Sequence, residues 1–188
     1  MAGTIYTVGH SNVTADAFFA TVAVPAIRTL ADVRAIPASR RHPHFAREAL
    51  AAACRERGIH YEWMPALGGR RRASTSASPH VAWEVEAFRN YADYTDSDEF
   101  AAALAALEDV AAGAPTAFMC AEALWWRCHR RLIADQLLVS GWEVLHIGGG
   151  GKTSPHRLPD FARVTDGRIV YDRGATGSLP LPAPARER

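Results

Sequence analysis

Short apolar runs alternate with segments of helical periodicity along most of the chain. Strands are predicted at residues 5–8, 27–33, 59–64, 115–120 and 142–147. Helices are predicted after a capping Thr14 and at residues 45–57, 83–94, 97–112 and 128–140, with Asp96 or Ser97 as the cap of the fourth. Because apolar strands separated by helices are typical of sheets covered on both faces, the pattern predicts an α/β fold with a mostly parallel five-stranded sheet flanked by helices.

The C-terminal part of the chain loses the helical pattern after Gly148. Residues 163–171 are predicted to form a small hairpin that turns at Asp166 and Gly167. The proline-rich segment 173–188 is predicted to be a flexible, disordered tail. Since 188 residues suit one compact core, we expect a single domain over residues 1–172.

Composition and charge exclude broad classes of function. The 21 Lys and Arg residues nearly balance 20 Asp and Glu, so the net charge of +1 does not favour nucleic acid or an anionic membrane. No run approaches the roughly 18 apolar residues that span a bilayer, and the N-terminus lacks the features of a signal peptide. We therefore expect a cytoplasmic protein without a membrane partner. Three cysteines are too few for a disulfide scaffold and are expected to be thiols or ligands.

Polar side chains follow the predicted strands, where ligands of open parallel sheets bind. We expect their tips to gather in one cavity. In chain order these side chains are His10, Ser11 and Asn12 after the first strand, Asp32 and Arg34 at the end of the second, Arg70, Arg71 and Arg72 in a long loop after the third, Cys120 and Glu122 after the fourth, and His146 at the end of the fifth.

The densest set of reactive side chains lies at residues 120–130. Cys120 and Glu122 follow the fourth predicted strand, and Cys128, His129 and Arg130 fall in the first turn of the next predicted helix. Free N–H groups at a helix start and an adjacent arginine lower the pKa of a thiol and bind anions. Either cysteine is thus a candidate nucleophile, with His129 or Glu122 as the acid or base and Arg130 holding an anionic group. The alternative is that both cysteines are simply small buried apolar side chains.

Several short motifs occur in a fixed order over about residues 5–150. They are Val8-Gly9-His10-Ser11-Asn12, Asp32-Val33-Arg34, Leu67-Gly68-Gly69-Arg70, Phe88 with Tyr91-Ala92, Cys120-Ala121-Glu122, and Cys128-His129-Arg130. In these motifs the chain resembles the DUF488 family of small bacterial and archaeal proteins. The resemblance implies an α/β fold and a shared polar pocket, but it implies no particular reaction. Trp125 stands where relatives often carry proline, a difference that bears on the rigidity of the loop.

A metal site is one alternative interpretation of the same residues. The chain has no C-x-x-C pair, and Cys128 and His129 are adjacent, so the spacing predicts no structural zinc site and no metal ligands are assigned. A site with fewer ligands and an open position would be catalytic rather than structural.

The preferred interpretation is an enzyme of unassigned reaction and unassigned cofactor that acts on an anionic substrate, such as a nucleotide or nucleic acid. Two alternatives stay open. One is a binding module without turnover that recognises nucleotides or nucleic acid through its arginines and Trp125 and Trp126. The other is a thiol redox, sulfur-transfer or metal-dependent protein. The catalytic candidates are Cys120, Glu122, Cys128 and His129, and the substrate-binding candidates are His10, Ser11, Asn12, Asp32, Arg34, Arg70, Tyr91, Trp126 and Arg130.

Overall fold

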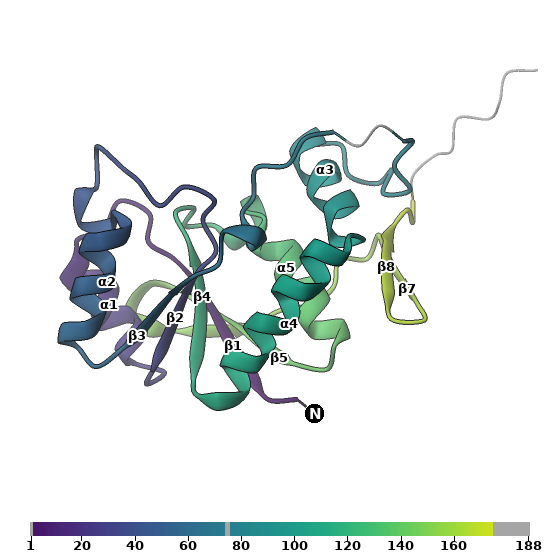
Figure 1. The fold of residues 1–188 in the computed structure, drawn as a ribbon. Helices are drawn as coiled ribbons and strands as arrows, with labels where there is room; N and C mark the ends of the chain where they lie inside the picture. The colour runs from purple at the N-terminus through teal and green to yellow at the C-terminus, as the bar shows by residue number, and fades with distance from the viewer. Residues whose placement is uncertain (1, 74–75, 175–188) are drawn as a thin grey trace, which may run out of the picture.

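The computed structural model describes residues 2–73 and 76–174 and contains a six-stranded sheet and a separate two-stranded hairpin (Figure 1). The strand order in the sheet is β3-β2-β4-β1-β5-β6. The strands are β1 (Thr4–Gly9), β2 (Thr29–Asp32), β3 (His60–Trp63), β4 (Thr116–Cys120), β5 (Glu143–Ile147) and β6 (Thr153–Pro155). The pairs from β3 to β5 are all parallel, whereas β6 is antiparallel to β5.

The predicted α/β fold is confirmed, with one strand more than expected. β1 to β5 match the five predicted strands. β6 was missed because it spans only three residues, all exposed, and it has neither an apolar run nor alternation to mark it.

Within the described ranges, five α-helices connect or follow the strands. They are α1 (Ala15–Ala23), α2 (Arg47–Glu56), α3 (Glu86–Thr95), α4 (Asp98–Gly113) and α5 (Arg130–Val139). Thr14 Oγ1 accepts from the N–H of Ala17, and Ser97 Oγ accepts from that of Phe100, which identifies Ser97 as the cap of α4. The prediction that Cys128 lies inside the last helix was wrong. Its backbone is extended (φ −125°, ψ 150°), His129 is the capping residue, and α5 begins at Arg130.

Each face of the sheet has its own apolar core. Phe18 of α1, Leu50 of α2 and Ala117 of β4 belong to one core, and Phe118 of β4 packs on the other side with Leu107 of α4. Successive residues of a strand point to opposite faces, so Ala117 and Phe118 supply both cores from one buried strand. Helices α1 and α2 therefore cover one face, and α3, α4 and α5 cover the other (Figure 1).

The chain changes direction between β1 and β4. The connection after β1 passes through α1 on one face to reach β2, while the connection after β4 passes through α5 on the other face to reach β5. Neighbouring strands whose connections leave on opposite faces leave a crevice at their carboxyl ends. Gly9 and Cys120, the last residues of β1 and β4, are paired at this position.

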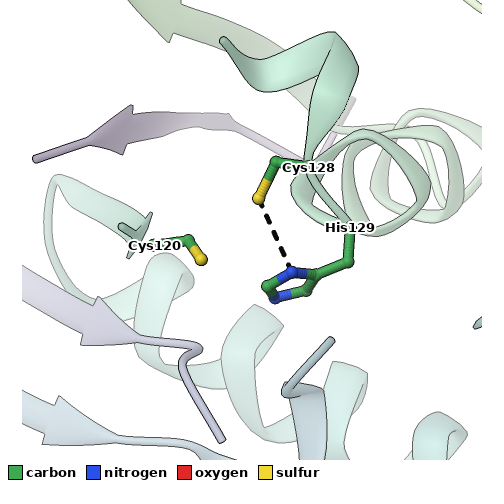
Figure 2. A group of neighbouring side chains, drawn as sticks. All are labelled: Cys120, Cys128 and His129. Atoms are coloured by element: carbon green, nitrogen blue, oxygen red, sulfur yellow. Dashed lines mark hydrogen bonds between the residues drawn. The ribbon is translucent and has the colours of Figure 1, made fainter. Parts of the chain in front are cut away.

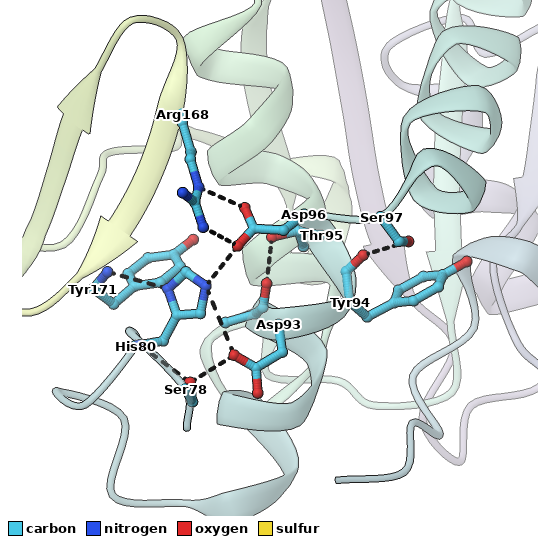
Figure 3. A network of polar contacts seen from close by, with 10 residues as sticks. Ser78, His80, Asp93, Tyr94, Thr95, Asp96, Ser97, Arg168 and Tyr171 are labelled. Atoms are coloured by element: carbon cyan, nitrogen blue, oxygen red, sulfur yellow. Dashed lines mark hydrogen bonds and ion pairs between the residues drawn. The ribbon is translucent and has the colours of Figure 1, made fainter. Parts of the chain in front are cut away.

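The C-terminal hairpin is present as predicted, with β7 (Ala162–Thr165), β8 (Arg168–Tyr171) and a turn at Asp166 and Gly167. Buried His80 attaches it to the domain (Figure 3). The N–H of Tyr171 donates to His80 Nδ1 at 3.4 Å, and His80 Nε2 lies 3.4 Å from Asp96 Oδ2. Arg168 donates to both carboxylate oxygens of Asp96, at 3.0 and 2.6 Å.

Most of the predicted tail, residues 175–188, lies outside the described residues. Within the described part of the chain, no helix has the length and apolar character needed to cross a bilayer.

Candidate functional site

A solvent-open cavity of about 720 Å³ lies at the carboxyl ends of β2 and β4. Segments far apart in the sequence form its walls, including the loops that follow β2, β3 and β4 and the residues just before α3 and α5. Its polar lining residues are Arg34, Arg70, Cys120, Glu122, Arg127, Cys128 and His129, and its larger apolar lining residues are Ile36, Val85 and Phe88. Six of the predicted site residues, including all four catalytic candidates, line this one cavity.

Cys120, Cys128 and His129 form what we call the Cys–His cluster. Cys120 is the last residue of β4, and Cys128 and His129 immediately precede α5. The two sulfur atoms and a ring nitrogen of His129 all lie within 4.8 Å of one another, and Cys128 Sγ is 3.5 Å from His129 Nδ1. Figure 2 shows the three side chains facing a common space.

A hydrogen bond to the residue that follows β2 fixes the orientation of the His129 ring. His129 Nε2 lies 3.1 Å from the carbonyl oxygen of Val33, the residue after β2. A carbonyl oxygen only accepts hydrogen bonds, so Nε2 carries a proton and Nδ1 is the ring nitrogen that faces the two thiols. Tyr91 packs against the same ring with a centroid separation of 5.3 Å and donates its hydroxyl to the carbonyl of Leu67.

Gly69 allows the loop after β3 to approach the cluster. A Cβ atom at this position would lie 2.4 Å from His129 Nδ1, far inside van der Waals contact. The glycine therefore leaves the ring nitrogen accessible next to the cavity.

The two thiols of the cluster differ in acidity. The hydrogen bond from Cys120 lowers the pKa of Cys128 to about 6 against the opposing effect of burial, and the positive charge of Arg130 acts in the same direction. The same hydrogen bond, together with burial, raises the pKa of Cys120 to about 12. Burial alone is the main reason that the pKa of the remote Cys54 is raised to about 12.

Arg34 reaches the cavity from a buried polar network. Its Nε and Nη2 donate to the two oxygens of Asp32 at 2.8 and 2.5 Å, and Tyr61 donates to the same carboxylate at 2.7 Å. His10 Nε2 lies 3.2 Å from Arg34 Nη1, and burial lowers the pKa of His10 to about 4, which keeps it a neutral acceptor. Asp32 and His10 therefore hold Arg34 in place and do not themselves line the cavity.

Arg130 points into the protein rather than into the cavity. It is 1% exposed, its Nη1 donates to Thr7 Oγ1 at 2.9 Å, and its Nη2 donates to the carbonyl of Glu122. Gly9 makes room for this contact, because a Cβ there would lie 1.9 Å from the carbonyl oxygen of Glu122. The structure thus places Arg130 as a support for the loop between β4 and α5.

The remaining predicted binding residues lie outside the cavity lining. Ser11 and Asn12 contact each other beside the end of β1, with Ser11 Oγ 3.3 Å from Asn12 Oδ1. Trp126 is 48% exposed and does not line the cavity. Tyr91 is fully buried and reaches the site only through its contact with His129.

Sequence reasoning did not assign several residues that the structure brings to the cavity. Arg127 stands within the reactive segment but was not singled out, and only the short 3-10 turn Trp125–Arg127 directs it to the cavity. Ile36 and Val85 are 65% and 55% exposed. The available signal in the sequence was a large apolar residue, Ile36, in the polar loop two positions after Arg34. No sequence pattern identifies the carbonyl of Val33 as the partner of His129.

A second buried network lies behind the loop that carries Trp125. His146 Nε2 is 2.9 Å from His156 Nδ1, and His156 Nε2 is 2.8 Å from Asp135 Oδ1. The Trp125 ring stacks on His146 with a centroid separation of 3.9 Å. Burial and the neighbouring His156 lower the pKa of His146 to about 3. This network fixes the loop from the far side and lies outside the cavity.

The fold and the cavity define the class of protein: an α/β domain with a polar site at the carboxyl edge of a doubly covered parallel sheet. Comparison with protein families gives a match to the family described as Domain of unknown function DUF488 over residues 14–137. The match spans more than half of the chain, and the protein belongs to this family, as the motifs indicated. No curated protein and no solved structure gave a significant match.

Proposed function

We propose that the protein is an enzyme that acts on an anionic substrate in the cavity, with the Cys–His cluster as its reactive centre. The observation that carries the proposal is the convergence of two thiols and an oriented imidazole in a cavity that is open to solvent and lined by arginines. Reactive groups gathered at the carboxyl edge of such a sheet are typical of enzymes.

The charges around the cavity favour an anionic ligand. Arg34 is neutralised by Asp32, but among the described residues Arg70 and Arg127 have no ion-pair partner, and both line the cavity. Against these stands the single carboxylate of Glu122 in the lining. An anionic group would gain charge-assisted hydrogen bonds from the arginines. Ile36, Val85 and Phe88 offer an apolar surface beside them, a combination that suits a nucleotide.

Glu122 is the proposed acid or base. It is exposed and lines the cavity, and its Oε1 accepts from the N–H of Leu124 at 3.1 Å, which restrains the carboxylate within the loop. General acid or base catalysis by such a group contributes about 10²-fold to 10⁴-fold in rate.

The test is turnover of a panel of nucleotides and phosphate esters by single variants. We expect Cys128→Ser and Glu122→Gln each to lower kcat by on the order of 10²-fold or more. Arg70→Ala and Arg127→Ala should each raise KM by about tenfold, because each removes one charge-assisted contact. The matched controls are Cys54→Ser and Arg55→Ala, which lie away from the cavity on α2.

Unchanged turnover in the Cys128 and Glu122 variants would contradict the proposal. Nucleotide binding without turnover that weakens with salt and survives both changes would contradict it as well, and would identify a binding module instead.

A further inference from the structure

We propose that Cys120, Cys128 and His129 bind one Zn²⁺ ion as three protein ligands, with the fourth coordination position open to the cavity. Two thiolates and one imidazole form a ligand set that zinc uses in catalytic sites. The inference goes beyond the proposed function, because binding of the ion does not depend on which substrate enters the cavity.

The distances within the cluster match a tetrahedral zinc site. With Zn–S near 2.3 Å and Zn–N near 2.0 Å, the sulfur and nitrogen of a tetrahedral site lie about 3.6 Å apart. Cys128 Sγ and His129 Nδ1 are 3.5 Å apart, and Cys120 Sγ lies within 4.8 Å of both. Movement of the Cys120 sulfur toward the other two ligand atoms is the adjustment that we expect when the ion binds.

Adjacent ligands are compatible with one ion here because the backbone turns between them. Cys128 is extended, whereas His129 has φ −57° and ψ −19° and starts the turn into α5. This change brings side chains that would diverge along a regular strand to the same side (Figure 2). Adjacent positions in the sequence therefore do not prevent Cys128 and His129 from binding the same ion.

The hydrogen bond at Nε2 of His129 is of the kind that zinc-bound histidines make. Such a histidine donates its other ring N–H to a carbonyl or carboxylate, which fixes both tautomer and orientation. His129 Nε2 makes this contact with the Val33 carbonyl at 3.1 Å, so Nδ1 is the ring nitrogen that faces the two thiols. Gly69 leaves the ring unobstructed on the cavity side.

The cavity determines the kind of zinc site. Among the described residues, the candidate ligand group consists of these three side chains, and all three line the open cavity. Three protein ligands with an accessible fourth position are the arrangement of catalytic rather than structural zinc. Both cysteines bind the ion as thiolates, so their two negative charges balance the charge of the ion and the arginines keep their attraction for an anion.

The experiment measures metal binding by the full chain without any substrate. Protein treated with a chelator and kept reduced is titrated with Zn²⁺, and the bound metal is counted by elemental analysis. We expect one zinc per chain. Co²⁺ in its place should give the intense visible absorption of a tetrahedral ion and a thiolate-to-cobalt charge-transfer band.

Two kinds of variant locate the site. Cys120→Ser and Cys128→Ser should each weaken Zn²⁺ binding by 10²-fold or more and reduce the charge-transfer band. Gly69→Ala keeps every ligand but places a methyl group against His129 Nδ1, and should weaken binding by at least about tenfold. The controls are Cys54→Ser in the opposite core and Gly113→Ala, where an added Cβ meets no atom within 4 Å.

Absence of stoichiometric zinc in the wild-type protein would overturn the inference. So would a cobalt spectrum without thiolate charge transfer, or equal affinities in the Gly69→Ala and Gly113→Ala variants. Zinc binding without turnover of any anionic substrate would leave the metal site intact and remove the proposed function. Turnover by a protein that takes up no zinc would overturn the metal site and leave the proposed function intact.

Discussion

The buried charge of Arg34 is compensated by an ion pair and by hydrogen bonds. Its guanidinium donates to both oxygens of Asp32, and a hydroxyl from Tyr61 meets the same carboxylate. Burying a charge is costly unless it is paired and hydrogen-bonded, and here every partner comes from β2, β3 or the loop after β1. The pair therefore links neighbouring strands just below the cavity.

Asp32→Asn tests this pairing. The change leaves the Arg34 charge buried without a counter-ion, so we expect the free energy of unfolding to fall by about 3 kcal/mol. Urea denaturation followed by circular dichroism measures the effect. The matched control is Asp16→Asn, which removes an exposed carboxylate 3.3 Å from Arg57 and should change stability by less than about 1 kcal/mol. Equal effects of the two changes would contradict the assigned role of the buried pair.

Residue type alone does not show which arginine of residues 120–130 faces the cavity. Arg127 and Arg130 are three positions apart, yet one lines the cavity and the other is buried against β1. The direction of each depends on where α5 begins, and a start at residue 128 instead of 130 rotates every side chain of the first turn. The sequence assigned the anionic group to Arg130, whereas the structure places Arg127 in the cavity lining and Arg130 in the interior.

At the scale of elements, the loop between β4 and α5 carries Glu122, Cys128 and His129, which are three of the four catalytic candidates. Contacts on two sides hold this loop in place. The side chain of Arg130 donates to the carbonyl oxygen of Glu122, and the ring of Trp125 stacks on that of His146. The close approach to β1 requires that residue 9 lack a side chain.

Gly9→Ala should displace this loop. The new Cβ would lie 1.9 Å from a backbone oxygen that cannot rotate away, so either the loop or β1 must move. We expect a loss of stability of about 2 kcal/mol or more. Thermal unfolding measures it, and Gly113→Ala at the open end of α4 serves as the control. A melting temperature equal to that of the control would show that the loop does not depend on this contact.

The elements themselves were largely predictable because their hydrophobic patterns are strong. β1, β2, β4 and β5 carry buried apolar residues, β3 carries the half-buried rings of Tyr61 and Trp63, and caps such as Thr14 and Ser97 mark helix starts. The exception, β6, is held by pairing with β5 and by no pattern of its own. Strand order was also outside the reach of local patterns, since the pairing of β2 with β4 joins segments from different parts of the chain.

Across the whole molecule, several histidines are buried in neutral form. Burial is the largest cause in each case, and it lowers the pKa of His10 to about 4, that of His146 to about 3, and that of His80 below its ordinary value. His10 lies beside Arg34, His146 behind the β4–α5 loop and His80 under the C-terminal hairpin, so the stability of three separate regions depends on a neutral histidine.

The protein should therefore lose stability in mild acid. A histidine whose pKa is lowered by folding takes up protons more readily in the unfolded chain. Its contribution is present above the unfolded value of 6.5 and is lost as the pH falls toward the folded value, about 4 for His10. For His10 the full difference is on the order of 3 kcal/mol. Urea midpoints measured between pH 7.5 and 4.5 should fall steadily below about pH 6.5.

His10→Gln should flatten this pH dependence, because glutamine does not titrate. His60→Gln, at a largely exposed side chain, should leave the dependence as it is in the wild type. Identical slopes in the two variants would rule out burial of His10 as a source of acid sensitivity.

The contact between His129 and Val33 spans 96 positions of the chain. Both thiols and the imidazole lie within ten residues of one another in the sequence, yet the partner that orients the ring is supplied by the strand next to β4. A chain whose central strands fail to pair would keep all three reactive groups and lose the arrangement that makes them a site.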